Sequence, residues 1–221
     1  MISEVDEISD FQADQIAFIG ESLAPFYRYD PRINAECLES LFNAFANMDP
    51  AEAAIEWPFV ETEEAKSCIV QMQRGLAAGY VDEDLYWEYR RLFVGPQAKV
   101  APPWGSVYLD KDQVIFGAST MELRDWLARH GIGIQKGNSD DPEDHIGTML
   151  LTISYIAQHE RAILKEFLRD HLLTWSGHFL ERVEAKSSHD FYRGLARLTR
   201  LSLKGIQEEL DVEVKHCRFY K

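Results

Sequence analysis

Seven histidines and three cysteines are the side chains of this 221-residue sequence most suited to binding a metal or a redox group. His171 and His178 are seven residues apart, but the intervening Trp175 to Gly177 predict an interruption of their helix. The sequence contains neither an HExxH nor a CxxC pattern, so nothing indicates a zinc site or a dithiol centre. We therefore expect no metal ion.

A second search concerns the loops that hold cofactors or nucleophiles. Gly131, Gly133 and Gly137 resemble a damaged dinucleotide-binding loop, but they follow a predicted helix rather than a strand, which favours a flexible hinge. Neither a Walker-type phosphate loop nor a Gly-x-Ser-x-Gly elbow occurs. The sequence therefore indicates a binding protein without a cofactor, rather than an enzyme. A nucleotide-dependent enzyme and a purely structural helical adaptor stay open as alternatives.

The first candidate binding segment is rich in apolar residues and runs from Glu88 to Asp110. Leu92 and Phe93 bring apolar bulk to a predicted helix end, and Pro103 and Trp104 bring it to the loop that follows. A tryptophan after two prolines has little conformational freedom, so a ligand could bind it with little ordering cost. We expect Trp104 to be partly accessible, although it could also close the end of the bundle as a core residue.

The second candidate segment is acidic and ends in a histidine. Asp141 suits the N-cap of a helix and Pro142 its first position, while Glu143 and Asp144 would favour the positive end of the helix dipole. His145 would then lie about one turn into the helix, beside the acids. An Asp–His pair there could bind an incoming backbone or guanidinium group. Both candidate segments follow breaks in the helical pattern, where a bundle can bring a loop and a helix start together, so we expect Asp144 and His145 to lie near Trp104.

The elements that position these two segments are predicted to be helices. Apolar residues repeat every three or four positions almost throughout, which predicts an all-α fold, a compact bundle of about ten helices in two lobes. We expect an N-terminal lobe over residues 1–130 with a long loop at 96–118, a hinge at 131–141 and a C-terminal lobe over 142–221. Within the long loop, the stretch from Val107 to Ile115 could form a short extended piece.

Charge and composition indicate which class of partner the protein binds and in which compartment it acts. The chain has 23 Lys and Arg against 37 Asp and Glu, a net charge of −14, which argues against nucleic acid and favours a basic partner or simple solubility. The three cysteines fit a reducing compartment. The acidic N-terminus does not resemble a secretory signal, and no apolar run is long enough to insert into a membrane. These features predict a cytoplasmic protein.

Four motifs together resemble the TorD/DmsD family of redox-enzyme maturation chaperones, also called twin-arginine proofreading chaperones. They are LFVGP at 92–96, PPWGSVYLD at 102–110, FG-ST at 116–120 and PEDH at 142–145, within a resemblance that runs from about Tyr86 to Tyr220. The resemblance implies an all-helical, non-enzymatic chaperone. Such proteins bind the twin-arginine signal peptide of a molybdopterin oxidoreductase subunit, like that of dimethyl sulfoxide reductase, and delay its export until the cofactor is inserted.

The resemblance also implies which residues bind the signal peptide and which partners exist. By motif position they are Leu92, Phe93, Pro103, Trp104, Asp144 and His145, and Tyr89 stands where the family tends to have tryptophan. The implied partners are the signal peptide, the catalytic subunit that carries it and the export machinery. An arginine pair followed by an apolar stretch is complemented by an acidic surface with an apolar floor. A general assembly factor that acts on the folded subunit is the alternative within the family.

Overall fold

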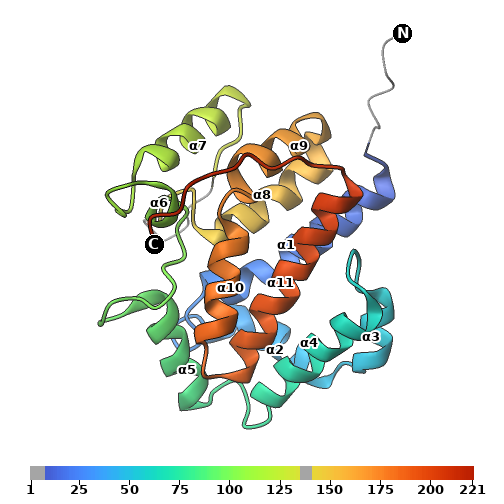
Figure 1. Cartoon of the computed structure of the whole chain (residues 1–221). Helices are drawn as coiled ribbons and strands as arrows, with labels where there is room; N and C mark the ends of the chain where they lie inside the picture. Colours follow the sequence, from blue (N-terminus) through green and yellow to red (C-terminus); the bar gives the residue numbers. More distant parts are fainter. Residues whose placement is uncertain (1–7, 135–140) are drawn as a thin grey trace.

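A computed structural model describes residues 8–134 and 141–221, and it confirms the all-α fold class. Eleven α-helices and no strand occur among these residues (Figure 1). The only extended pairing in the described ranges is one antiparallel bridge between Trp104 and His145. The α-helices are α1 (Asp10–Arg28), α2 (Ala35–Asn47), α3 (Pro50–Glu56), α4 (Thr62–Gly75), α5 (Glu83–Tyr89), α6 (Ser106–Leu109), α7 (Ala118–Arg129), α8 (Ile146–His159), α9 (Leu164–Phe167), α10 (Ser176–Lys186) and α11 (Asp190–Glu209). Three short turns, π-helical or 3-10, complete the set: η1 (Arg90–Val94), η2 (Arg161–Ile163) and η3 (Leu168–Leu172).

The most extensive helix pair is α1 with α8, two helices that are far apart in sequence. Their backbones approach closely because Gly20 carries no side chain: a Cβ there would overlap the Leu150 carbonyl oxygen and the Ser154 hydroxyl. The Ser154 hydroxyl donates to the Ala17 carbonyl at 3.0 Å, which ties the two helices together. The apolar periodicity predicted both helices, and this glycine lets them meet.

The pair α4 and α11 forms the other main contact, and α10 packs beside α11 (Figure 1). Phe26 of α1, Phe42 of α2 and Phe191 of α11 form a triangle of rings with centroids 5.1 to 5.2 Å apart. Helices from both halves of the chain therefore share one apolar core. The division into lobes at residues 131–141 stays a prediction, and residues 135–140 of that segment lie outside the described ranges.

Two local predictions were wrong because contacts distant in sequence decide the local structure. Helix α8 begins at Ile146 rather than Pro142, and its N-cap is His145 rather than Asp141. The Ile146 amide donates to the Pro103 carbonyl at 2.8 Å, so the preceding residues follow the other segment rather than a helix. The predicted extended piece begins instead with the helix α6, whose first amide, that of Ser106, donates to the Asp144 carboxylate at 2.6 Å.

Candidate functional site

The two candidate segments cross each other in space, as the sequence analysis predicted. Two backbone hydrogen bonds flank the crossing: the Ile146 amide donates to the Pro103 carbonyl at 2.8 Å, and the Gly105 amide donates to the Asp144 carbonyl at 3.1 Å. The rings of Trp104 and His145 meet edge to face, with centroids 6.0 Å apart. Segments that are forty residues apart thus share one short antiparallel bridge.

His145 serves the backbone and the site at once. Its Nδ1 accepts from the Gly147 amide at 3.1 Å and so caps α8. Burial lowers the pKa of His145 to about 4, with Asp141 opposing the shift, so the ring is neutral at neutral pH. An accepting Nδ1 requires the ring proton to be on Nε2. The neutral ring therefore keeps one hydrogen-bond donor that the cap does not use.

A groove of about 870 Å³ lies on one side of the crossing. It contains five of the seven predicted site residues, namely Tyr89, Phe93, Pro103, Trp104 and His145. Its charged residues balance, with the cations Arg28, Arg90 and Lys99 against the acids Asp30, Glu36 and Asp141. The aromatic half of the predicted site is therefore assembled in one place, but the groove has no excess of acid.

The other two predicted site residues are not part of this groove. Leu92 is fully enclosed in the apolar core. Asp144 lines a separate cleft on the other side of the crossing and is only 3% exposed. Trp104 is 8% exposed, so it is more enclosed than we expected from the sequence. Its Nε1 donor finds no acceptor among the described residues.

The cleft that contains Asp144 has a volume of about 260 Å³ and is acidic. Its charged lining comprises the acids Asp110, Glu122, Asp144 and Asp170 and the cations Lys215 and Arg218. One Asp144 oxygen, Oδ2, accepts from the Ser106 amide, while Oδ1 is buried without a hydrogen-bond partner in the part of the chain that the structure describes. Burial raises the pKa of the Asp144 carboxyl, and the bond from Ser106 opposes that shift. The acidic part of the site is thus a second compartment.

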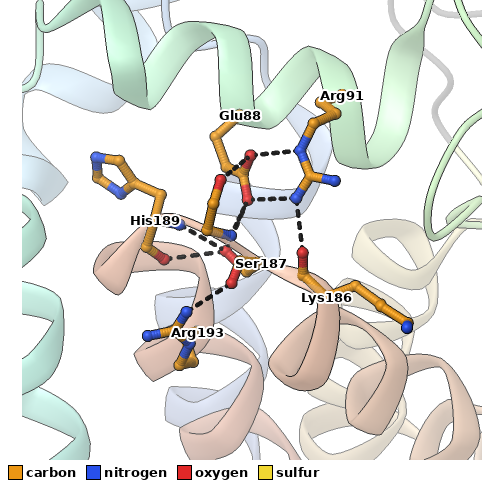
Figure 2. A network of polar contacts seen from close by, with 7 residues as sticks. Glu88, Arg91, Lys186, Ser187, His189 and Arg193 are labelled. Carbon is orange, nitrogen blue, oxygen red and sulfur yellow. Dashed lines mark hydrogen bonds and ion pairs between the residues drawn. The ribbon is translucent and has the colours of Figure 1, made fainter.

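A buried carboxylate holds the helix that carries Tyr89 and Phe93 (Figure 2). Glu88 accepts from the Arg91 guanidinium at 2.7 and 2.9 Å, from the Ser187 hydroxyl and from the amide and hydroxyl of Ser188. Burial alone would raise the pKa of Glu88, but these hydrogen bonds outweigh it and hold the pKa at about 2. Arg91 also donates to the Lys186 carbonyl at 2.7 Å, so α5 and η1 are fixed to the end of α10.

The π-helical turn η1 then directs the loop toward the crossing. The carbonyls of Arg91 and Leu92 accept from the Val100 and Ala101 amides at 3.2 and 3.0 Å, so the loop folds back along the turn. A π-helical turn leaves the helical hydrogen-bond pattern and often occurs at functional sites. This return path ends at Pro103 and brings Trp104 to the groove.

The sequence analysis missed the wall of the groove that comes from the first two helices. Arg28, Tyr29 and Asp30 at the end of α1, with Ile33 and Cys37, line the groove. The sequence Asp30-Pro31 is typical of a helix end, but no periodicity connects that end with Trp104. Only the packing of α1 on α8 brings it beside His145.

Metal-binding clusters and membrane-spanning helices are both absent from residues 8–134 and 141–221. In these ranges no group of three or more His, Cys, Asp or Glu side chains is arranged to hold a metal ion. None of the helices described is long and apolar enough to cross a bilayer.

Comparison with known proteins shows the relationship that the motifs suggested. The model of the nitrate reductase delta subunit family matches residues 62–181. A probable Tat proofreading chaperone DmsD from Haemophilus influenzae is 37% identical over 208 residues, which cover 94% of this chain and 97% of that protein. This chain belongs to the TorD/DmsD family of chaperones. The family includes two further relatives of this chain: the Tat proofreading chaperone DmsD of Salmonella typhimurium is 34% identical over 92% of this chain and 94% of its own, and the chaperone protein YcdY of Escherichia coli is 30% identical over 76% and 83%.

Proposed function

We propose that this TorD/DmsD-family protein is a cytoplasmic proofreading chaperone that binds the twin-arginine signal peptide of a molybdopterin oxidoreductase subunit and aids its maturation before export. It acts by binding, without turnover. The observation that carries the proposal is the groove in which Tyr89, Phe93, Pro103, Trp104 and His145 meet. Relatives named Tat proofreading chaperone DmsD, 34 to 37% identical over more than nine-tenths of the chain, support the choice of ligand.

The groove is suited to the apolar part of such a peptide. Its rings offer an apolar floor, and burial of apolar surface contributes about 25 cal/mol per Å² before the cost of ordering the peptide. The Trp104 Nε1 donor, unpaired in the described chain, and the proton on His145 Nε2 suit backbone carbonyls of an extended ligand. The apolar surface of the groove and these two hydrogen-bond donors together favour an extended apolar segment over a compact ligand.

The arginine pair is better matched to the acidic cleft than to the groove. The groove has as many cations as acids, and its Arg90 pairs with Asp30 at 3.4 Å, whereas the cleft has more acids than cations. Asp144 and His145 are adjacent in sequence yet line different compartments. A peptide that passes the crossing would therefore place its arginines toward Asp144 and its apolar stretch toward Trp104.

Tryptophan substitutions test this arrangement directly. A synthetic twin-arginine peptide is titrated into the wild-type protein and the variants Trp104→Phe and Trp87→Phe, with intrinsic fluorescence and calorimetry as readouts. Trp87 is 54% exposed and does not line the groove, so its replacement is the matched control.

We expect the fluorescence change to disappear in Trp104→Phe alone, and the affinity to fall about tenfold, because the ring contributes both area and a hydrogen bond. An unchanged signal and affinity in Trp104→Phe would remove the groove as the binding site. A peptide with lysines in place of both arginines tests the charged part, since lysine cannot make the two-pronged contact with a carboxylate.

A further inference from the structure

The C-terminal segment, residues 211–221, lies over the acidic cleft. After α11 the chain runs past α9 and reaches α6, near α7 (Figure 1). Residues 212–221, all of them described, form neither helix nor strand. Lys215, Cys217, Arg218 and Tyr220 form one wall of the cleft that contains Asp144. The segment is therefore part of the site rather than a distant end.

The hydrogen bonds of the segment within the described chain involve its backbone, including a 2.8 Å contact between the Lys221 carbonyl and His178 Nε2, while the Phe219 ring stacks on His178 with centroids 4.4 Å apart. The Lys215 amide donates to the Arg169 carbonyl at 3.3 Å, and the Tyr220 amide donates to the Tyr108 carbonyl at 2.9 Å. The Tyr220 carbonyl accepts from the Gln113 side chain at 2.8 Å. Backbone contacts of this kind depend little on sequence, so another extended peptide could make them.

The segment carries a small net positive charge in an acidic protein. Residues 211–221 contain three cations, Lys215, Arg218 and Lys221, against two acids, Asp211 and Glu213, in a chain whose net charge is −14. Lys215 helps, after the hydrogen bond from Arg169, to lower the pKa of Asp170 on the cleft wall. Arg218 and Lys221 flank the two aromatic residues Phe219 and Tyr220, so the end of the segment is both basic and aromatic.

The segment leaves the Asp144 carboxylate in the cleft without its full set of hydrogen bonds. Asp144 is 3% exposed, and its Oδ1 has no hydrogen-bond partner in the described part of the chain. The Ser106 and Thr120 hydroxyls are buried beside this carboxylate and help to lower its pKa, but neither is in hydrogen-bond geometry with Oδ1. A buried acceptor without a well-placed donor is costly, so Oδ1 suits a stronger donor, which the segment does not supply.

We propose that the acidic cleft is a binding site for an extended basic–aromatic peptide, and that residues 213–221 occupy its entrance as a built-in competitor. An incoming peptide displaces the segment, takes over its backbone contacts on α6, and presents a guanidinium to Asp144. The identity of that peptide as a twin-arginine signal rests on the function proposed above. The site and its competitor rest on the cleft and the segment alone.

A proline substitution releases the segment without changing its charge. Tyr220→Pro removes the amide that donates to Tyr108, whereas His216→Pro changes an exposed residue whose amide makes none of the hydrogen bonds found in the described chain. Both variants are made in the full chain, and circular dichroism verifies their folding. The probes are a labelled twin-arginine peptide and a labelled copy of residues 213–221.

We expect Tyr220→Pro to bind both peptides about two- to tenfold more tightly than the wild type, the range that one backbone hydrogen bond allows, and His216→Pro to bind like the wild type. In the wild-type protein, either peptide should accelerate hydrogen exchange of the amides of residues 214–221. Equal affinity in both variants together with unchanged exchange would overturn the proposal.

The two peptides distinguish failure of this proposal from failure of the proposed function. Tighter binding of the 213–221 copy by Tyr220→Pro, with no binding of the twin-arginine peptide by any form, would support the competitor and refute the proposed ligand. Binding of the twin-arginine peptide in the groove, with no response of the segment to either peptide, would support the function and refute the competitor.

Discussion

At the residue scale, Asp144 and His145 each divide their polar atoms between structure and site. His145 uses Nδ1 to cap α8 and Asp144 uses Oδ2 to hold the first amide of α6. His145 lines the groove and Asp144 lines the cleft, and the polar atoms left over by these two bonds are His145 Nε2 and Asp144 Oδ1. We therefore expect a substitution at either residue to change stability and peptide binding together, so that a single variant does not separate the two effects.

Two substitutions of His145 do separate them. His145→Ala removes the cap and the ring, so we expect a loss of about 1 kcal/mol from the cap, some further loss from burial, and weaker peptide binding. His145→Asn keeps a side-chain acceptor at the N-cap, so most of the capping stability should return while binding stays weak. Urea denaturation and peptide titration measure the two effects. Recovery of both in His145→Asn would show that the ring itself does not bind the peptide.

At the element scale, the position of each wall depends on contacts between distant helices. The Glu88 cluster fixes α5 and η1 to the end of α10 (Figure 2), and Gly20 lets α1 lie against α8. The end of α1 and the start of α8 both line the groove, through Arg28 and His145. A change at the α1–α8 contact should therefore affect a groove that it does not touch.

Gly20→Ala tests this dependence. The new methyl would overlap the Leu150 carbonyl, so we expect a loss of about 1 to 3 kcal/mol in the free energy of unfolding. We also expect the groove to bind the peptide more weakly. Gly177→Ala is the matched control, because a Cβ there meets nothing within 4 Å. It should be neutral or slightly stabilising, since alanine favours helix more than glycine does. Equal stability of the two variants, measured in urea, would contradict the close α1–α8 packing.

The sequence predicted which segments form helices better than it predicted the residues at which those helices begin and end. The periodicity of Ile146 to Ile156 predicted α8, but the cap was assigned to Asp141, because a local pattern does not show that Pro103 accepts from the Ile146 amide. The breaks in the helical pattern before both segments correctly predicted that Trp104 and His145 lie together. They did not predict that Asp144 lines another compartment, since that depends on which side of the crossing each side chain occupies.

At the scale of the whole molecule, protons should destabilise the fold in two pH ranges. Burial places the folded pKa of His145 at about 4, below its ordinary 6.5, and the hydrogen bonds of Glu88 place its pKa at about 2, below 4.5. In both cases the unfolded state binds more protons, so stability rises with pH.

We therefore expect stability to fall as pH decreases from about 6.5 to 4 and again from about 4.5 to 2, by roughly 3 kcal/mol or less for each group. Urea midpoints across this range measure the effect. His145→Asn should lessen the fall in the upper range, where His171, whose pKa burial also lowers to about 4, accounts for a further part, and Glu88→Gln should flatten the lower range. A wild-type profile that is level between pH 7 and 4 would contradict the burial of a neutral His145.

The net charge of −14 acts on encounter with a basic peptide more than on the bound complex. Charges on the surface are screened within about 10 Å at 0.1 M salt, whereas buried apolar area is not. We expect higher salt to slow association with a twin-arginine peptide several-fold and to leave dissociation nearly unchanged, as surface-plasmon kinetics would show. A dissociation rate that rises steeply with salt would indicate that charge pairs, rather than area, hold the peptide.

The crossing of the two segments has a consequence for discrimination. Because Trp104 and His145 face the groove while their neighbours Gly105 and Asp144 face the cleft, a wall one residue thick separates the compartments. A ligand tethered in one compartment meets the other at an effective concentration of about millimolar, and such avidity can exceed either single affinity by about 10²- to 10⁴-fold. A peptide with only the apolar half, or only the basic half, gains none of it. Under the function proposed above, two weak contacts in tandem would reject the many cellular peptides that have one feature without the other.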